Sequence, residues 1–189
     1  MERHLLEPFL PKNARLMMLG SFPPKPEKWS MNFYYPNPQN DMWRIFGLVF
    51  FDDKSFFERV EGRGFDETKI KNFLRDKGIA VGDMARFVNS ARGTASDKDL
   101  EILETLNIAK TLLKIPHCAA LAATGQKACG ALAKAANCPI PQMGEFAEAE
   151  ILSRKLKIFR MPSSSRAYPM RLEEKARFYE SMFSRLGLL

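Results

Sequence analysis

The sequence predicts an α/β fold, a three-layer α/β/α arrangement around a central, mostly parallel four-stranded sheet. Two observations lead to this prediction. Four short apolar runs are separated by helical patterns, and none of these runs alternates cleanly between polar and apolar residues. Strands covered by helices on both faces have this character, and strand–helix alternation favours right-handed crossovers between parallel strands.

The four runs give the predicted strands, which cover residues 15–19, 79–81, 119–124 and 156–161. Asp41 is expected to cap a helix that continues through Phe50, and Asp66 to cap a second helix that stops at Gly78. Gly125 opens an alanine-rich helix that extends to about Ala136.

Two further helices are predicted from their apolar spacing. Ser96 or Asp97 is expected to cap a segment with apolar residues at Leu100, Leu103 and Leu106. The last helix places one apolar stripe against the core, formed by Leu172, Ala176, Tyr179, Phe183 and Leu186.

Length and composition indicate the class of protein. The 189 residues, 46% of them hydrophobic, fit a single domain spanning 1–189. No apolar run approaches the length that crosses a bilayer, and the charged N-terminus is unlike a secretory signal. We therefore expect a monomeric cytoplasmic protein that does not bind a membrane.

Cysteine and histidine positions argue against a metal site. Cys118, Cys129 and Cys138 are odd in number and are predicted to be buried free thiols. His4 and His117 form no metal-ligand spacing. We expect no metal and no cofactor. The net charge of +7 moderately favours a polyanionic partner, although many basic proteins bind no nucleic acid.

The loops after the first and last predicted strands open on the same edge of a parallel sheet, where such sheets bind ligands. The first loop begins Gly20-Ser21-Phe22-Pro23-Pro24, and the last contains three serines followed by Arg166. The serine and arginine donors suit a phosphate, whereas the alternative is an ordinary turn that caps the final helix. The aromatic side chains could stack a base or close the core; these are Phe22, Phe33, Tyr34 and Tyr35.

Polar residues follow the other strands as well. Asp83 could accept a hydrogen bond from a base N–H, or satisfy nearby backbone amides. Lys127 lies at the start of the helix that Gly125 opens after the third strand, where a helix N-terminus could hold one DNA phosphate. A carboxamide at Asn40 could orient water or cap the following helix, and the sequence favours neither; for Asn37, capping is favoured.

Three stretches in this order resemble motifs of the uracil-DNA glycosylase superfamily. They are Leu19-Gly-Ser-Phe-Pro-Pro24, Tyr34-Tyr-Pro-Asn-Pro-Gln-Asn-Asp-Met-Trp43 and Met161-Pro-Ser-Ser-Ser165. The most similar branches are the mismatch-specific uracil glycosylases and the hypoxanthine (deoxyinosine) glycosylases. The resemblance implies a parallel four-stranded sheet between helices, in agreement with the strand prediction.

The resemblance also implies an activity and a set of site residues. The substrate is double-stranded DNA with a deaminated base, uracil or hypoxanthine, that is flipped out and released without strand cleavage. Asn40 matches the catalytic asparagine of the hypoxanthine-type branch. The expected base-binding residues are Gly20, Ser21, Phe22, Pro23, Tyr34, Tyr35 and Asp83, and the expected DNA-binding residues are Ser163, Ser164, Ser165, Arg166, Tyr168 and Lys127.

This chain departs from the superfamily at two positions. Phe22 stands where many members carry an activating Asp or Asn, and Met161 stands where many carry His or Asn. These departures lead us to expect a slow enzyme, or one restricted to bases that leave readily. They also keep two alternatives open: a non-catalytic member that recognises damaged or single-stranded nucleic acid, and a protein that binds small nucleotides.

Overall fold

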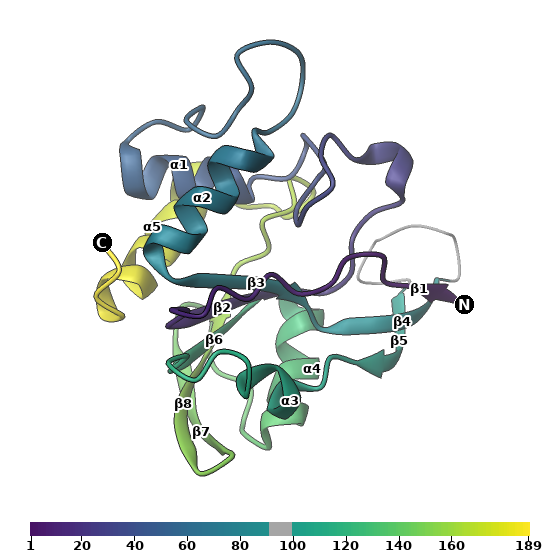
Figure 1. Ribbon diagram of the computed structural model, residues 1–189, viewed down its shortest axis with the longest axis vertical. Coiled ribbons are helices and arrows are strands. Elements are labelled where there is room, and N and C mark those ends of the chain that lie inside the picture. The colour runs from purple at the N-terminus through teal and green to yellow at the C-terminus, as the bar shows by residue number, and fades with distance from the viewer. Residues whose placement is uncertain (91–99) are drawn as a thin grey trace.

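The structure, a computed structural model, describes residues 1–90 and 100–189 (Figure 1). Its central sheet has five strands in the order β3-β2-β6-β8-β7. The four predicted strands are confirmed and run parallel to one another; they are β2 (Leu16–Gly20), β3 (Ile79–Asp83), β6 (Ala120–Thr124) and β8 (Arg154–Met161).

The fifth strand, β7 (Phe146–Ile151), pairs antiparallel with β8 and was not predicted from the sequence. A turn at Leu152 and Ser153 joins the two strands, with φ of 56° and 57°. Left-handed backbone in a two-residue hairpin turn is typical of Asn-Gly, so this hairpin lacks its usual sequence signal.

The helices form a layer on each face of the central sheet, which confirms the predicted three-layer architecture (Figure 1). Leu16 and Met18 of β2 pack against α1 (Met42–Phe51), α2 (Glu67–Lys77) and α5 (Leu172–Arg185). Met17 and Leu19 point to the opposite face, toward α3 (Ile108–Leu112) and α4 (Gln126–Ala136). Burial on both faces explains the uninterrupted apolar runs.

The predicted helix ends are mostly confirmed. Asp66 accepts a hydrogen bond from the Lys69 amide at 2.9 Å, and Gly78 ends α2 with φ of 68°. Asp41 immediately precedes α1 as expected, but its carboxylate does not cap the helix. The side chain of Asn40 does so instead, because its Oδ1 accepts the Met42 N–H at 2.9 Å.

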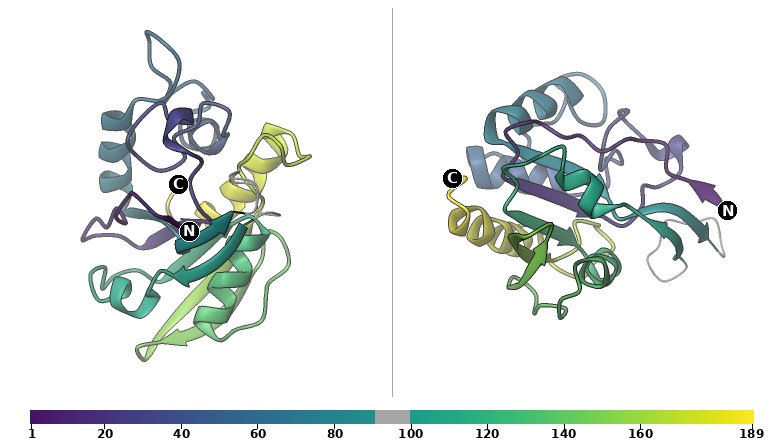
Figure 2. Two further views of the ribbon diagram at one scale, coloured as in Figure 1. Left: turned by 90° about the vertical axis from the view of Figure 1, so that its right-hand side faces the viewer. Right: turned by 60° about the horizontal axis from the view of Figure 1, so that its bottom comes forward.

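A second sheet, of order β1-β4-β5, extends from the first and is antiparallel (Figure 2). It contains β1 (Glu2–Arg3), β4 (Ala85–Ser90) and β5 (Leu100–Thr105). The helix predicted over Leu100 and Leu103 is therefore wrong. Pairing with β4 buries Leu100 against Val88 and leaves Leu103 47% exposed, so long-range contacts decided the local structure. Ser96 and Asp97, its predicted caps, lie outside the described residues.

The loop between β2 and α1 contains a short 3₁₀ helix, η1 (Pro26–Lys28). The three cysteines are free thiols, with Cys118 and Cys129 buried and Cys138 half-buried. Across residues 1–90 and 100–189, no helix is long and apolar enough to cross a membrane. Within the same ranges, no group of three His, Cys, Asp or Glu side chains could hold a metal ion.

Candidate functional site

The carboxyl ends of the four parallel strands lie at one edge of the central sheet. The register pairs Gly20 with Asp83 between β2 and β3, and Thr124 with Met161 between β6 and β8. Leu19 of β2 pairs with Ala123 of β6, which places the ends of the β2–β3 pair and of the β6–β8 pair at the same level. The loops predicted to form the site therefore start from a common edge.

The side chain of Asp83 lies directly over Gly20. A Cβ added to Gly20 would sit 2.2 Å from Asp83 Oδ1 and 3.3 Å from the Tyr35 hydroxyl oxygen. Since side chains do not approach so closely, only glycine at position 20 allows this arrangement. The end of β2 thus brings a carboxylate oxygen and a phenol hydroxyl together above its backbone.

His4 joins this cluster from the N-terminus and was missed by the sequence analysis. Its Nε2 lies 2.8 Å from Asp83 Oδ2, and its ring packs edge-on against Phe22 at 5.4 Å between centroids. The side chains of His4 and Asp83 are both buried. A contact between residues 79 apart in the chain leaves no local signal, so nothing near His4 could have indicated it.

Tyr34 and Tyr35 have different environments. The Tyr35 hydroxyl hydrogen-bonds to Thr124 Oγ1 at 3.2 Å, and its backbone is left-handed with φ of 52°. The ring of Tyr34 is buried, and its hydroxyl has no hydrogen-bond partner among the described residues. Burial, and second the Asp83 carboxylate, raise the pKa of both phenols well above the ordinary value, so both hydroxyls keep their protons.

The two predicted loops meet at the start of α1. Asn40 forms an isolated antiparallel bridge with Ser165, and the Asp41 N–H donates to the Ser164 carbonyl at 2.8 Å. Residues 20–43 and the serine-rich loop after β8 are thus joined by backbone hydrogen bonds. The contact holds Asn40 beside the loop that was predicted to bind DNA.

A buried ion pair fixes this junction. Lys175 of α5 is 1% exposed, and its Nζ donates to Asp41 Oδ2 at 3.0 Å and to the Ser165 carbonyl at 2.8 Å. The half-exposed Arg166 donates to the other carboxylate oxygen, Asp41 Oδ1, at 3.0 Å. Asp41 was expected to cap α1, and no role was expected of Lys175, because Lys on an amphipathic helix is normally solvated.

The remaining predicted residues lie around these two clusters. Ser163 Oγ accepts the Ser165 N–H at 3.2 Å, which shapes the turn, while Ser164 is buried. The Tyr168 hydroxyl lies 3.8 Å from Met143 Sδ. Pro23 is buried, whereas Ser21 and Lys127 are half-buried, Lys127 being the second residue of α4.

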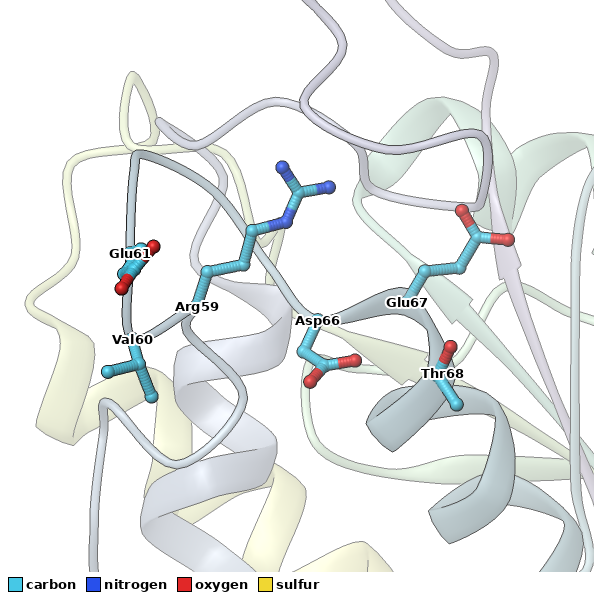
Figure 3. Close-up of a pocket in the computed structure, with 6 residues that line it drawn as sticks. All are labelled: Arg59, Val60, Glu61, Asp66, Glu67 and Thr68. Atoms are coloured by element: carbon cyan, nitrogen blue, oxygen red, sulfur yellow. The ribbon is translucent and has the colours of Figure 1, made fainter.

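A hollow of about 540 Å³ lies elsewhere, between the loop after α1 and the start of α2 (Figure 3). It is lined by Arg59, Val60, Glu61, Asp66, Glu67 and Thr68, none of which belongs to the predicted site. Three of its charged groups are already engaged: Arg59 donates to the Phe65 and Ser30 carbonyls, Asp66 caps α2, and Glu67 pairs with Lys71. Its lining therefore does not indicate a ligand.

The fold and this strand edge define a three-layer α/β protein with a mostly parallel sheet, whose candidate site lies where the parallel strands end. The same fold occurs in the solution NMR structure of a candidate uracil DNA glycosylase from Methanosarcina acetivorans. The likeness covers 98% of each chain, with a TM-score of 0.64 and 19% sequence identity. At this identity the comparison concerns the fold. No model of a known protein family and no curated protein matches the chain.

Proposed function

We propose that this protein is a monofunctional DNA glycosylase that releases a deaminated base, uracil or hypoxanthine, from double-stranded DNA in base excision repair. One observation carries the proposal: the bridge between Asn40 and Ser165 joins the loop after β2 to the loop after β8. The likeness to the Methanosarcina acetivorans protein supports the same assignment at the level of fold.

The flipped base binds at the strand edge above Gly20. Flipping costs a few kcal/mol and is least costly for a mismatched base, which gives selection before chemistry. Asp83 accepts a hydrogen bond from a base N–H, and Phe22 or Tyr35 contacts the ring. Ser163, Ser165 and Arg166 lie on the adjoining loop and bind the DNA backbone, where arginine suits phosphate.

Asn40 positions the attacking water. Its Oδ1 accepts the Met42 N–H, which fixes the orientation of the amide group. A carbonyl oxygen has a second lone pair, and the amide nitrogen has two N–H groups, so both ends can bind water. A neutral amide cannot remove a proton from that water as a carboxylate could, so catalysis depends more on stabilising the leaving base.

The reaction ends at base release. A glycosylase that also cleaves the strand needs an amine that attacks the sugar. Lys175, which lies beside Asn40 in this junction, is buried and paired with Asp41. It serves a structural role, and the product is an abasic site in an intact strand.

The test compares Asn40→Ala with Asn72→Ala, an exposed asparagine on α2 that serves as a matched control. Duplexes containing uracil, hypoxanthine or xanthine are incubated with excess protein, and abasic sites are cleaved with alkali. We expect base release by the wild-type protein, a loss of about 100-fold or more in Asn40→Ala, and no change in Asn72→Ala. If no duplex is converted by the wild-type protein, the enzymatic proposal fails.

A second candidate is a non-catalytic protein that recognises damaged or single-stranded DNA. It is favoured by the apolar Phe22 and Met161 at two positions where the superfamily commonly has polar groups, together with the net charge of +7. This candidate predicts DNA binding that weakens steeply with salt, without release of a base. The alkali assay separates it from the glycosylase.

A further inference from the structure

The N-terminal segment delivers a buried histidine to the proposed base site. β1 pairs with β4, and the His4 N–H donates to the Arg86 carbonyl at 2.9 Å, so the backbone is anchored up to and including this residue. The imidazole then packs between two aromatic rings, with centroids 5.4 Å from Phe22 and 5.9 Å from Tyr34. Its side chain is fully buried.

The two hydrogen bonds of His4 define its tautomer. Nδ1 accepts the Leu6 N–H at 3.1 Å, so this nitrogen carries no proton in the arrangement. The ring proton is therefore on Nε2, which donates to Asp83 Oδ2 at 2.8 Å. The backbone of residue 6 sets the tautomer, and the tautomer sets which ring atom faces Asp83.

This arrangement leaves the second oxygen of Asp83 available. Oδ1 lies above Gly20, close to the position that a Cβ would occupy. Among the described residues, the side-chain hydrogen bond of Asp83 is made by its other oxygen, Oδ2, with His4 Nε2. A ligand N–H at this position would donate a hydrogen bond to Oδ1, so that both oxygens of Asp83 would have a donor.

The Tyr34 hydroxyl is a buried polar group without a partner among the described residues. It is the one buried side-chain polar atom among the described residues that forms no hydrogen bond, and Tyr34 is 2% exposed. A buried hydroxyl left unpaired costs about 1–3 kcal/mol, so such a group points to a ligand or an ordered water. Its ring contacts His4, which places it next to the same cluster.

We propose that His4 is a positioning residue for base recognition: it orients Asp83 so that Oδ1 accepts an N–H of the bound base, while Tyr34 donates its hydroxyl to a carbonyl oxygen of that base. Both groups occur on uracil and on hypoxanthine. The inference rests on the proposed function for the identity of the ligand. It assigns Tyr34 a polar contact through its hydroxyl, in place of stacking through its buried ring.

The experiment measures lesion recognition separately from chemistry. The probes are duplexes with one 2′-fluoro-2′-deoxyinosine or 2′-fluoro-2′-deoxyuridine, whose glycosidic bond resists cleavage, and an undamaged duplex of the same sequence. His4→Leu removes the donor, His4→Gln keeps an N–H donor, and Tyr34→Phe removes only the hydroxyl. His117→Gln, at an exposed histidine, is the control.

The expected result is a loss of lesion preference with unchanged binding of the undamaged duplex. Tyr34→Phe and His4→Leu each lose about 10-fold or more of the preference, the effect of removing a hydrogen bond to or from a charged or buried group. His4→Gln retains most of it, and His117→Gln is unchanged. In single-turnover base release, the half-saturating protein concentration rises more than the maximal rate falls.

Imidazole nitrogen NMR of the free protein tests the positioning directly, and it does so without any DNA. We expect the His4 ring to be protonated at Nε2 and unprotonated at Nδ1. Proton on Nδ1, a folded His4→Leu that keeps full lesion preference, or a wild-type protein with no lesion preference would each overturn the inference. If His4-dependent preference is found but no base is released from natural duplexes, the glycosylase proposal fails and the recognition role stands.

Discussion

At the scale of single residues, the candidate site depends on charges and hydroxyls that are removed from water. Asp41 shares its carboxylate between a buried lysine and a half-exposed arginine, and Lys175 also holds the Ser165 carbonyl. Burying an ion pair is costly, and removing one partner is costlier because the other charge remains buried. The pair therefore fixes the junction between α1, α5 and the serine-rich loop.

Lys175→Met should destabilise the protein by about 3–5 kcal/mol, since it keeps the side-chain stem but leaves a buried carboxylate with only one cation. Lys71→Met, which removes a half-exposed partner of Glu67 on α2, is the matched control and should cost about 1 kcal/mol or less. Urea unfolding measures both. Equal effects in the two variants would contradict the structural role of Lys175.

Tyr34→Phe should raise the free energy of unfolding at pH 7 by about 1 kcal/mol, because it removes an unpaired buried hydroxyl. The substitution should also change how the free energy of unfolding depends on pH in the alkaline range. Burial raises the pKa of Tyr34 in the folded state, whereas the unfolded phenol loses its proton near pH 10. Below about pH 10 this phenol therefore causes no loss of wild-type stability with pH. As pH rises further, the free energy of unfolding of the wild-type protein declines, because unfolding releases the Tyr34 proton.

Urea titrations from pH 7 to pH 11 test this prediction. The advantage of Tyr34→Phe over the wild-type protein should grow above about pH 10, because unfolding of the wild-type chain releases one more phenol proton than unfolding of the variant. A variant that is less stable than wild type at pH 7 would show that the hydroxyl has a partner in the folded protein.

At the scale of elements, sequence patterns predicted structure reliably where the residues that decide the structure lie close together in the chain. The parallel strands and most helix ends could be predicted, because continuous apolar runs, Asp66 and Gly78 each act within a few residues. β5 could not be predicted, since its apolar spacing suits a helix and its pairing with β4 decides the outcome. β7 could not be predicted because Leu152 and Ser153, which join it to β8, lack a turn signature.

The candidate site likewise contains residues that local sequence patterns predict and residues that they do not. Gly20, Asp83 and the serine-rich loop could be predicted because they follow strands, and parallel strands end at a common edge. The partners that organise them, His4 and Lys175, come from the two ends of the chain. Their contacts span 79 and 134 residues, so no spacing in the sequence reveals them.

The turn of the β7–β8 hairpin offers a test at this scale. The double substitution Leu152→Asn with Ser153→Gly should stabilise the protein by about 1 kcal/mol, because both positions are left-handed and Asn-Gly adopts this turn with less strain. Leu113→Asn, at an exposed position with φ of −61°, should bring no gain. Thermal and urea unfolding report the difference; a loss of stability in the double variant would mean that the turn adopts another conformation.

At the scale of the whole molecule, the fold gathers loops from distant parts of the chain at one sheet edge. The +7 net charge favours approach to DNA, and the edge supplies the groups that would meet one extruded nucleotide. In the proposed complex, a base from DNA lies against residues 20–43, and the adjoining DNA strand lies against the loop after β8.

Photocrosslinking tests that claim most directly. One duplex has 5-iodouracil opposite guanine, and a second has it at the neighbouring nucleotide beside a uracil–guanine mismatch; crosslinked peptides are identified by mass spectrometry. We predict that the first probe labels Phe22 or Tyr35, and that the second labels the loop at Tyr168. Adducts confined to α3, α4 or the hollow beside Arg59, with none in residues 20–43, would contradict the account.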